Sequence, residues 1–178
     1  DLDFALAKEL RLRLDDACRD AEGAVSLLWE TGSVVDRFEG TGVVTKAAAE
    51  GLGIVGPAAR ASGVGLDTRR NFPYGPYERF TMAVSGSGDV YSRAYVRWLE
   101  IQKSAALVRG WLEALPEGPT EAECGPLAPD SGAVSLVEGW RGQICHAALT
   151  GPDGRFLRYK VVDPSFHNWQ ALAMALRG

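Results

Sequence analysis

The chain has 178 residues, a formal net charge of −4 and a hydrophobic fraction of 46%; this length is enough for one domain with a sizeable core. No cluster of lysine and arginine forms a basic stripe, which argues against a nucleic-acid partner, and no apolar run approaches the roughly 20 residues that cross a bilayer. Cys18, Cys124 and Cys145 are scattered and form no CxxC pair, so they predict neither a zinc nor an iron–sulfur site and fit a reducing cytoplasm.

The first predicted element is a long amphipathic helix. Apolar residues recur from Leu6 to Leu28 at i, i+4, i+8 and i+11, which places them on one helical stripe. Thr31-Gly32 is expected to close this helix, and Ser33 to cap a short further turn that runs through Phe38.

A short helix over Lys46–Glu50 is expected next, with Thr45 before it and Gly51 as its stop. The letters from Gly51 to Gly56 match the dinucleotide-binding pattern GxGxxG. That mechanism needs a strand before the glycines and a helix after them. Because a helix precedes them here, we do not expect nucleotide binding.

The segment from Gly56 to Phe80 is predicted to be an irregular loop that is packed and carries charge. It has no period, but its aromatic residues each gain about 1.5–3 kcal/mol from burial, and a long loop in a compact domain is usually functional or disordered. The alternative is a structural loop whose arginines cap helices and pair with acids. The aromatic residues are Phe72, Tyr74, Tyr77 and Phe80, and the charged ones are Arg60, Asp67, Arg69, Arg70, Glu78 and Arg79.

A short strand over 80–84 and a turn over 85–88 lead to a second long helix, Val90 to Leu115, which Pro116 ends. One face of this helix carries the row Arg93, Arg97 and Glu100. Arg97 and Glu100 could pair, but two arginines one turn apart repel unless an anion faces them. The row is therefore predicted to face the central segment or a partner, with a solvated face as the alternative.

The last third of the chain predicts a small antiparallel sheet followed by a helix. A loop over 116–132 leads to strands at 133–137, 143–150 and 155–162, with a hairpin turn at 151–154. Asp163 or Ser165 is expected to cap a final helix from Phe166 to Leu176. The whole chain, residues 1–178, is predicted to be a single α+β domain in which long helices pack with this sheet.

Few residues point to chemistry by themselves. His146 lies mid-strand and is expected to be structural, whereas His167 and Asn168, in the first turn of the last helix, are placed to face a cleft. No cluster has metal-ligand spacing and no nucleophile motif is legible.

Four blocks of sequence resemble one superfamily, which contains the quinone-proximal large subunit of respiratory complex I and the large subunits of membrane-bound, group 4 [NiFe]-hydrogenases. The variants around Trp140 and Trp169 are closer to the hydrogenase-3/4 type. The blocks are Gly56-Pro57 with Arg60, Ser62-Gly63-Val64, Asp67, Arg69, Pro73-Tyr74 and Tyr77; Gly88-Asp89 through Arg93, Arg97, Glu100 and Ser104; Glu138-Gly-Trp-Arg141-Gly142; and Asp163-Pro-Ser-Phe through Asn168 to Leu172.

The resemblance implies roles for these residues. Arg141, with Glu138, is expected beside the redox centre, and Gln143 replaces a carboxylate common in the family. The cavity or a proton route is expected to involve Arg60, Asp67, Arg69, His167 and Asn168, and Arg93, Arg97 and Glu100 are expected to meet a partner or form structural ion pairs. We therefore expect at least one of Arg60, Asp67 and Arg69 to share a cleft with Arg141 or His167.

The two CxxC pairs that bind nickel and iron in the hydrogenases have no counterpart here, so the resemblance implies a central-to-C-terminal fragment of a larger oxidoreductase subunit. This fragment is expected to hold no metal and to be inactive alone, although its parent could hold a nickel–iron centre. The implied partners are an iron–sulfur small subunit and a membrane arm, with quinone as a further candidate, at the cytoplasmic face of the inner membrane. A metal-free, complex I-type quinone-reducing subunit and a non-catalytic scaffold that binds partners are the alternatives.

Overall fold

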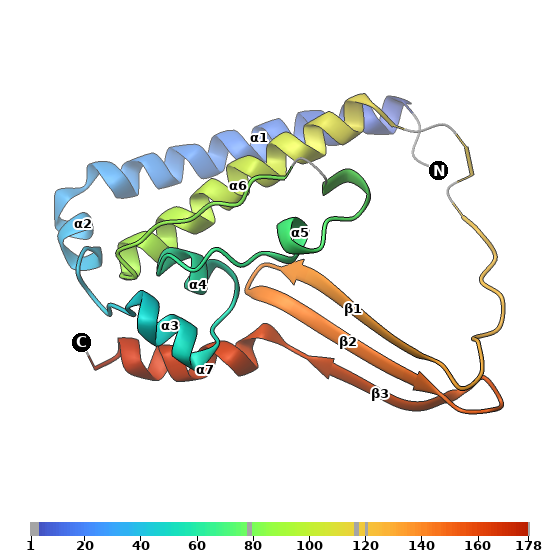
Figure 1. Ribbon diagram of the computed structural model, residues 1–178. Helices are drawn as coiled ribbons and strands as arrows, with labels where there is room; N and C mark the ends of the chain where they lie inside the picture. Colours follow the sequence, from blue (N-terminus) through green and yellow to red (C-terminus); the bar gives the residue numbers. More distant parts are fainter. Residues whose placement is uncertain (1–3, 78–79, 116–117, 120, 178) are drawn as a thin grey trace.

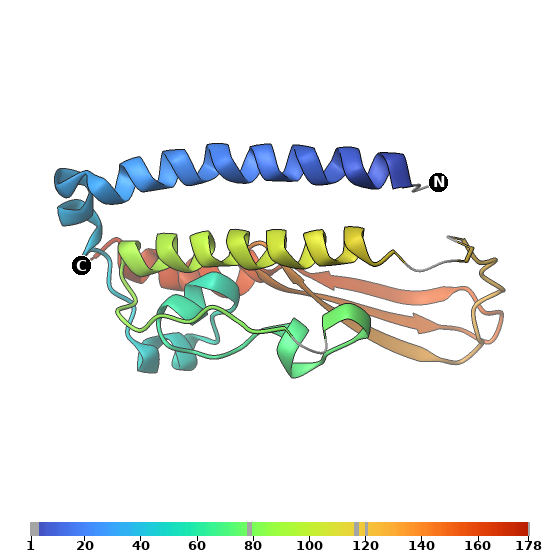
Figure 2. The same cartoon turned by 90° about the horizontal axis from the view of Figure 1, so that it is seen from above.

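The computed structural model describes residues 4–77, 80–115, 118–119 and 121–177 and has the predicted α+β architecture (Figure 1). Two long antiparallel helices lie side by side, and the short helix that follows the first of them lies at one end of this pair. The other short helices, the sheet and the last helix lie on the side of the second long helix (Figure 2). The helices are α1 (Phe4–Glu30), α2 (Gly32–Phe38), α3 (Lys46–Leu52), α4 (Gly56–Ala61), α5 (Thr68–Asn71), the 3₁₀ turn η1 (Gly75–Tyr77), α6 (Val90–Glu113) and α7 (Pro164–Ala175); the strands are β1 (Gly132–Gly139), β2 (Gly142–Thr150) and β3 (Phe156–Val162).

The two long helices form as their periodicity predicts. Ion pairs join them: Arg109 Nε lies 2.6 Å from Asp15 Oδ1, and Arg11 Nη1 lies 2.5 Å from Glu113 Oε1. Pro116, predicted to end α6, lies outside the described residues.

The helix caps differ from the prediction in detail. Thr31, and not Ser33, is the N-cap of α2, because its backbone is already extended before the first helical residue. Thr45 Oγ1 accepts a hydrogen bond from Ala48 N at 3.2 Å, as an N-cap should. The helix that it starts continues past Gly51 and closes at Gly53, whose φ of 63° is left-handed.

The central segment is not irregular as predicted, because α4, α5 and η1 form within it. Pro57 in the first turn starts α4, and the Asp67 side chain caps α5. Burial of its aromatic residues is only partly confirmed: Phe80 is buried, whereas Phe72 is 61% and Tyr74 51% exposed. The predicted strand over 80–84 is wrong, since these residues belong to no described sheet, and Glu78 and Arg79 lie outside the described residues.

The sheet is an antiparallel meander in the order β1-β2-β3. Its register pairs Glu138 with Gln143 and Gly139 with Gly142, so Trp140 and Arg141 form the turn between the first two strands. The predicted turn over 151–154 joins β2 to β3. Asp163 then caps α7, accepting a hydrogen bond from Ser165 N at 2.7 Å.

One hydrophobic cluster, rich in alanine and valine, lies between α3, α4 and α7, and a second cluster is formed by Ala61, Ala83 and Val96. Val44, Ile54, Ala59, Val64 and Ala171 are all buried in the first cluster. Small residues such as alanine let the backbones of these helices approach closely.

Candidate functional site at the sheet end

Five charged side chains form a buried cluster among α4, α5, α6 and β1: Arg60, Asp67, Arg69, Glu100 and Glu138. Arg60 lies at the centre and its side chain is 1% exposed. Its Nη1 is 2.8 Å from Glu138 Oε1 and 3.2 Å from Asp67 Oδ2, and its Nη2 is 3.4 Å from Glu100 Oε1. A buried charge persists only when it is paired, and these three carboxylates supply the pairing.

Arg69 completes the cluster from the first turn of α5. Its Nη2 lies 2.6 Å from Asp67 Oδ2 and 2.6 Å from Glu100 Oε2, and its Cζ lies 4.0 Å from the centre of the Phe80 ring. Burial lowers the pKa of Arg69, but the hydrogen bonds to Asp67 and Glu100 outweigh burial and raise this pKa above its ordinary value. Arg69 therefore stays charged in the folded protein.

The cluster has three carboxylates and two guanidiniums, one negative charge in excess. Neutral donors meet part of this excess, since Thr68 N and Thr68 Oγ1 donate to Glu138 Oε2 at 3.1 and 3.2 Å. Among the described residues, the buried atoms Arg60 Nε and Glu100 Oε1 have no hydrogen-bond partner, although the latter faces Arg60 at ion-pair distance. Both residues line a cavity of about 250 Å³, which has room for a water at these atoms.

The turn that carries Arg141 is held by its backbone. A Cβ on Gly56, whose φ is +69°, would lie 2.4 Å from Arg141 O and 2.4 Å from Gly142 Cα, so only glycine allows this approach. Asn168 Nδ2 donates to Arg141 O at 3.0 Å, and Asn168 Oδ1 accepts from Val55 N at 3.0 Å. Elements α4 and α7 therefore fix the turn from two sides.

The guanidinium of Arg141, in contrast, is largely free. Its Nη2 lies 3.2 Å from Asp163 Oδ2, and its side chain is 64% exposed. Hydrogen bonds from Ser165, and then the contact with Arg141, hold the pKa of Asp163 below its usual value. An exposed ion pair adds little stability, so this guanidinium can turn towards a ligand at small cost.

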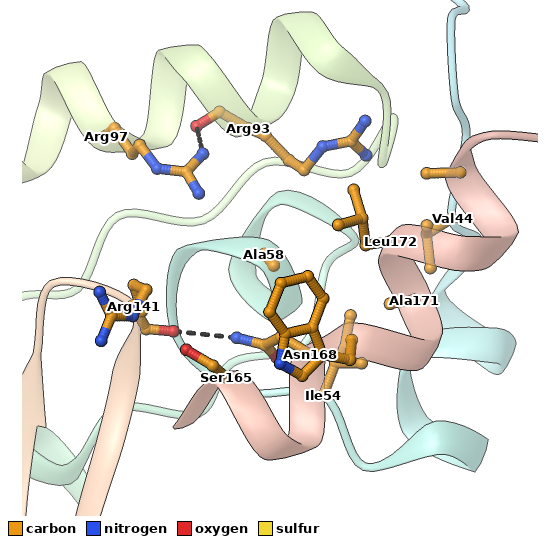
Figure 3. A pocket seen from close by; sticks show the side chains of 12 residues that line it. Val44, Ile54, Ala58, Arg93, Arg97, Arg141, Ser165, Asn168, Ala171 and Leu172 are labelled. Atoms are coloured by element: carbon orange, nitrogen blue, oxygen red, sulfur yellow. Dashed lines mark hydrogen bonds between the residues drawn. The ribbon is translucent and has the colours of Figure 1, made fainter. Parts of the chain in front are cut away.

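A cavity of about 300 Å³ opens between α6 and α7 (Figure 3). Arg93, Arg97 and Arg141 line it, together with Asn168 and Trp169 of α7. Burial lowers the pKa of both Arg93 and Arg97. The cavity therefore combines three positive charges with walls that are otherwise mostly apolar.

The predicted row on α6 divides between two sites. Glu100 joins the buried cluster and faces the central segment, as expected, while Arg93 and Arg97 line the α6–α7 cavity. The suggested Arg97–Glu100 pair does not form among the described residues. Arg97 Nη1 donates to Arg93 O at 2.8 Å, and the Glu100 carboxylate pairs with Arg60 and Arg69 instead.

We expected Arg141 to share a cleft with charged residues of the central segment. For the cavities described, this expectation is wrong. The α6–α7 cavity, which Arg141 lines, includes none of Arg60, Asp67 and Arg69 in its described lining. Glu138 meets these residues instead, because it precedes the turn and points to the helices. His167 lies outside this described lining too, with its ring 5.8 Å from that of Phe166.

Sequence reasoning did not single out Ser165, Trp169 and Leu172 as cavity residues. They lie at i, i+4 and i+7 of α7, which places them on one helical face. That spacing was a signal in the sequence, although it does not say what the face meets.

Among the described residues, no group of three or more His, Cys, Asp or Glu side chains is arranged to hold a metal ion. The three cysteines are free and lie on α1, in the segment before β1, and on β2. These residues do not fit a nickel–iron centre, which the family resemblance assigns to four thiolates. No described helix is both long enough and apolar enough to cross a membrane.

Comparison with known proteins gives a consistent result. The family model described as "Respiratory-chain NADH dehydrogenase, 49 Kd subunit" matches residues 1–127. The carbon monoxide-induced hydrogenase of Rhodospirillum rubrum is 38% identical over 168 residues, 93% of this chain and 46% of the relative. An NADH-quinone oxidoreductase polypeptide of Solibacter usitatus (strain Ellin6076) is 30% identical over 148 residues, 81% of this chain and 40% of the relative.

A solved structure shares the fold. A chain of the membrane-bound sulfane sulfur reductase, described as an archaeal respiratory membrane complex, matches with a TM-score of 0.79 and 23% identity, over 98% of this chain and 53% of that chain. The present chain thus spans about half the length of the proteins that it matches.

Proposed function

Because the chain belongs to the family of the 49 kDa subunit of respiratory-chain NADH dehydrogenase, we propose that it forms part of the large subunit of a membrane-associated redox complex. Its contribution is a rigid wall of the cavity beside the redox centre, with Arg141 as a fixed positive charge. The hydrogenase relative supports a hydrogenase-like parent. The family model and the NADH-quinone oxidoreductase relatives support a quinone-reducing parent without its own metal.

The observation that carries this proposal is how Arg141 is held. Its backbone is clamped by Gly56 and Asn168, while its guanidinium remains 64% exposed. A preorganised positive charge stabilises negative charge that develops near it without reorganising during the reaction. The clamp fixes the backbone from which the guanidinium reaches, so that only side-chain torsions remain to be ordered, and in the proposal Asn168 acts by positioning Arg141.

The buried cluster supports the same turn through the end of β1. Glu138, three residues before Arg141, is tied to Arg60, which fixes the end of β1 against α4. In the proposal Arg60, Asp67 and Arg69 shape the cavity wall or a proton route next to it. In the proposal His167 and Asn168 belong to the same route, although His167 lies outside the described lining of the cavity.

We further propose that the chain, within its large subunit, binds an iron–sulfur small subunit and a membrane arm, at the cytoplasmic face of the inner membrane. The solved structure with this fold is named as part of a respiratory membrane complex, which supports such an assembly. A nickel–iron centre in the parent would take its ligands from outside the described residues.

Purification of the subunit from its native membranes tests the proposal. A tagged subunit should bring down an iron–sulfur protein and carry hydrogenase or quinone-reductase activity. About one nickel per complex would identify the hydrogenase-like parent. Quinone reduction without nickel would identify the quinone-reducing parent. Recovery of the subunit without iron and without either activity would contradict the proposal and leave the non-catalytic scaffold as the remaining alternative. The 178-residue chain alone is expected to be inactive and to hold no stoichiometric nickel, as its three thiols predict.

A further inference from the structure

Arg97 has hydrogen-bonding capacity that the described residues leave unused. A guanidinium carries five N–H donors, and the hydrogen bond found for Arg97 is the one from Nη1 to Arg93 O. No carboxylate of the described residues lies within 4.0 Å of its nitrogen atoms. Arg97 nevertheless lines the α6–α7 cavity and is only partly exposed.

A second arginine adds positive charge one turn earlier on α6. Arg93 Nη1 donates to Gly42 O at 3.0 Å and to Gly88 O at 2.6 Å, so both N–H groups of this nitrogen are used and the guanidinium is held in place. After burial, the charge of Arg97 is the next cause that lowers the pKa of Arg93. The described lining of the cavity contains no Asp or Glu, so an anion entering it would relieve this repulsion.

The walls opposite the arginines restrict the shape of such an anion. Trp169, Leu172 and Ile54 belong to the lining of the cavity, and Figure 3 shows the apolar side chains of Leu172 and Ile54 on the side that faces α6. A tetrahedral anion such as phosphate presents oxygen in every direction and would lose hydration against this wall. A carboxylate places both oxygens at one end, matches the planar fork of arginine and leaves an apolar body for the wall.

We propose that the α6–α7 cavity binds a carboxylate carried on an apolar body, with the carboxylate on Arg97, in the field of Arg93 and Arg141, and the body against Trp169 and Leu172. The volume of about 300 Å³ lies at the lower end of small-molecule sites and fits a body the size of an aromatic ring. This site does not depend on the redox role of the chain. A free carboxylate and an acidic side chain of a neighbouring polypeptide share this chemistry.

Titration of the ¹⁵N-labelled chain with benzoate tests the site, with the Trp169 indole N–H as reporter, assigned by loss of its resonance in Trp169→Phe. We expect saturable shifts with a Kd of about 1 mM, as for a ligand of about nine non-hydrogen atoms. Benzamide, which has the same shape without the charge, should bind at least tenfold more weakly. Equal binding of the two, or no shift with benzoate, would overturn the proposal.

Variants locate the carboxylate. Arg97→Met should weaken benzoate binding at least tenfold, Arg97→Lys should weaken it less, and Arg158→Gln, an exposed arginine on β3, should leave it unchanged. If Arg97→Met does not fold, the Arg97→Lys variant alone tests whether Arg97 holds the carboxylate, because a lysine lacks the planar fork. Wild-type affinity in both Arg97 variants would contradict the assignment.

Two further titrants complete the test. Inorganic phosphate should not shift the Trp169 indole, and phosphate binding as tight as that of benzoate would overturn the apolar part of the proposal. Acetyl-Phe-Glu-Leu-amide is compared with its Gln counterpart. Glu-dependent binding tighter than that of benzoate supports the proposal and assigns the carboxylate to a polypeptide, whereas weaker binding supports a free carboxylate.

Discussion

Arg60 is an arginine in the core whose side chain contacts carboxylates from α5, α6 and β1. Replacing a complete buried ion cluster by apolar residues can be neutral, but removing one member leaves its partners charged and without compensation. Arg60 is the member with the most partners. Its removal leaves Glu138 without an ion-pair partner in the cluster and leaves Asp67 and Glu100 with Arg69 as their one remaining guanidinium.

We predict that Arg60→Gln lowers the free energy of unfolding by about 3–5 kcal/mol. Urea denaturation followed by circular dichroism measures this change. The matched control is Arg70→Gln, because Arg70 is nearby in sequence but exposed, and its loss should change stability by less than about 0.5 kcal/mol. Equal stability of the two variants would show that the cluster does not hold the fold together.

A second prediction concerns Asp89, the buried N-cap of α6. Burial raises its pKa, but hydrogen bonds from Ser92 N, Gly40 N and the Ser87 hydroxyl outweigh burial, so its pKa lies below the ordinary value. A carboxyl whose folded pKa is depressed stabilises the protein above its unfolded pKa, near 4, and this stabilisation is lost as the pH falls through the folded pKa.

Asp89→Ala should therefore destabilise the protein at pH 7 by about 1–3 kcal/mol. The difference from the wild type should shrink as the pH falls below about 4. Denaturation curves at neutral and acid pH check this, with Asp36→Ala, at an exposed site on α2, as the control. A difference that stays constant with pH would contradict the role of the charge.

At the scale of elements, the docking of the β1–β2 turn on α4 depends on Gly56. Gly56→Ala would place a methyl group 2.4 Å from Arg141 O and would add the cost of a left-handed φ, about 1–2 kcal/mol. We predict displaced amide resonances at Arg141 and Gly142 and a loss of several kcal/mol. Gly51→Ala is the control, since nothing lies within 4 Å of a Cβ there, and it should stabilise α3 by up to about 1 kcal/mol. Equal stability of the two variants would exclude the close approach.

The regular elements could be predicted because their signals are local. The apolar stripe from Leu6, the strand alternation after residue 132 and the Asp163 cap all led to elements that form. The strand over 80–84 could not be tested from the sequence, because a strand needs a partner and Phe80 instead packs against Arg69. The short helices α4 and α5 carry Arg60 and Arg69, whose ion pairs with Glu100 and Glu138 are tertiary contacts that no local pattern reveals.

At the scale of the whole molecule, the sequence singled out the charged residues but not how they group. The charged residues of the buried cluster, from Arg60 in α4 to Glu138 in β1, come together, whereas Arg141, only three residues after Glu138, lines a different cavity. The division arises because Glu138 ends a strand and Arg141 lies in the turn beyond it. The direction in which each of these two side chains points depends on how the turn docks on Gly56, and this docking is set by the complete fold.

The proposed role of the chain depends on Arg141, so its substitution in the intact membrane complex tests the account most directly. Turnover of hydrogen or quinone is measured in complexes with Arg141→Gln, Arg141→Lys and, as a control, Arg158→Gln, after the amount of assembled complex has been shown to be equal. We predict that Arg141→Gln lowers turnover about 100-fold, that Arg141→Lys retains part of it and that Arg158→Gln is unaffected. Full turnover in Arg141→Gln would contradict the placement of this charge beside the redox centre.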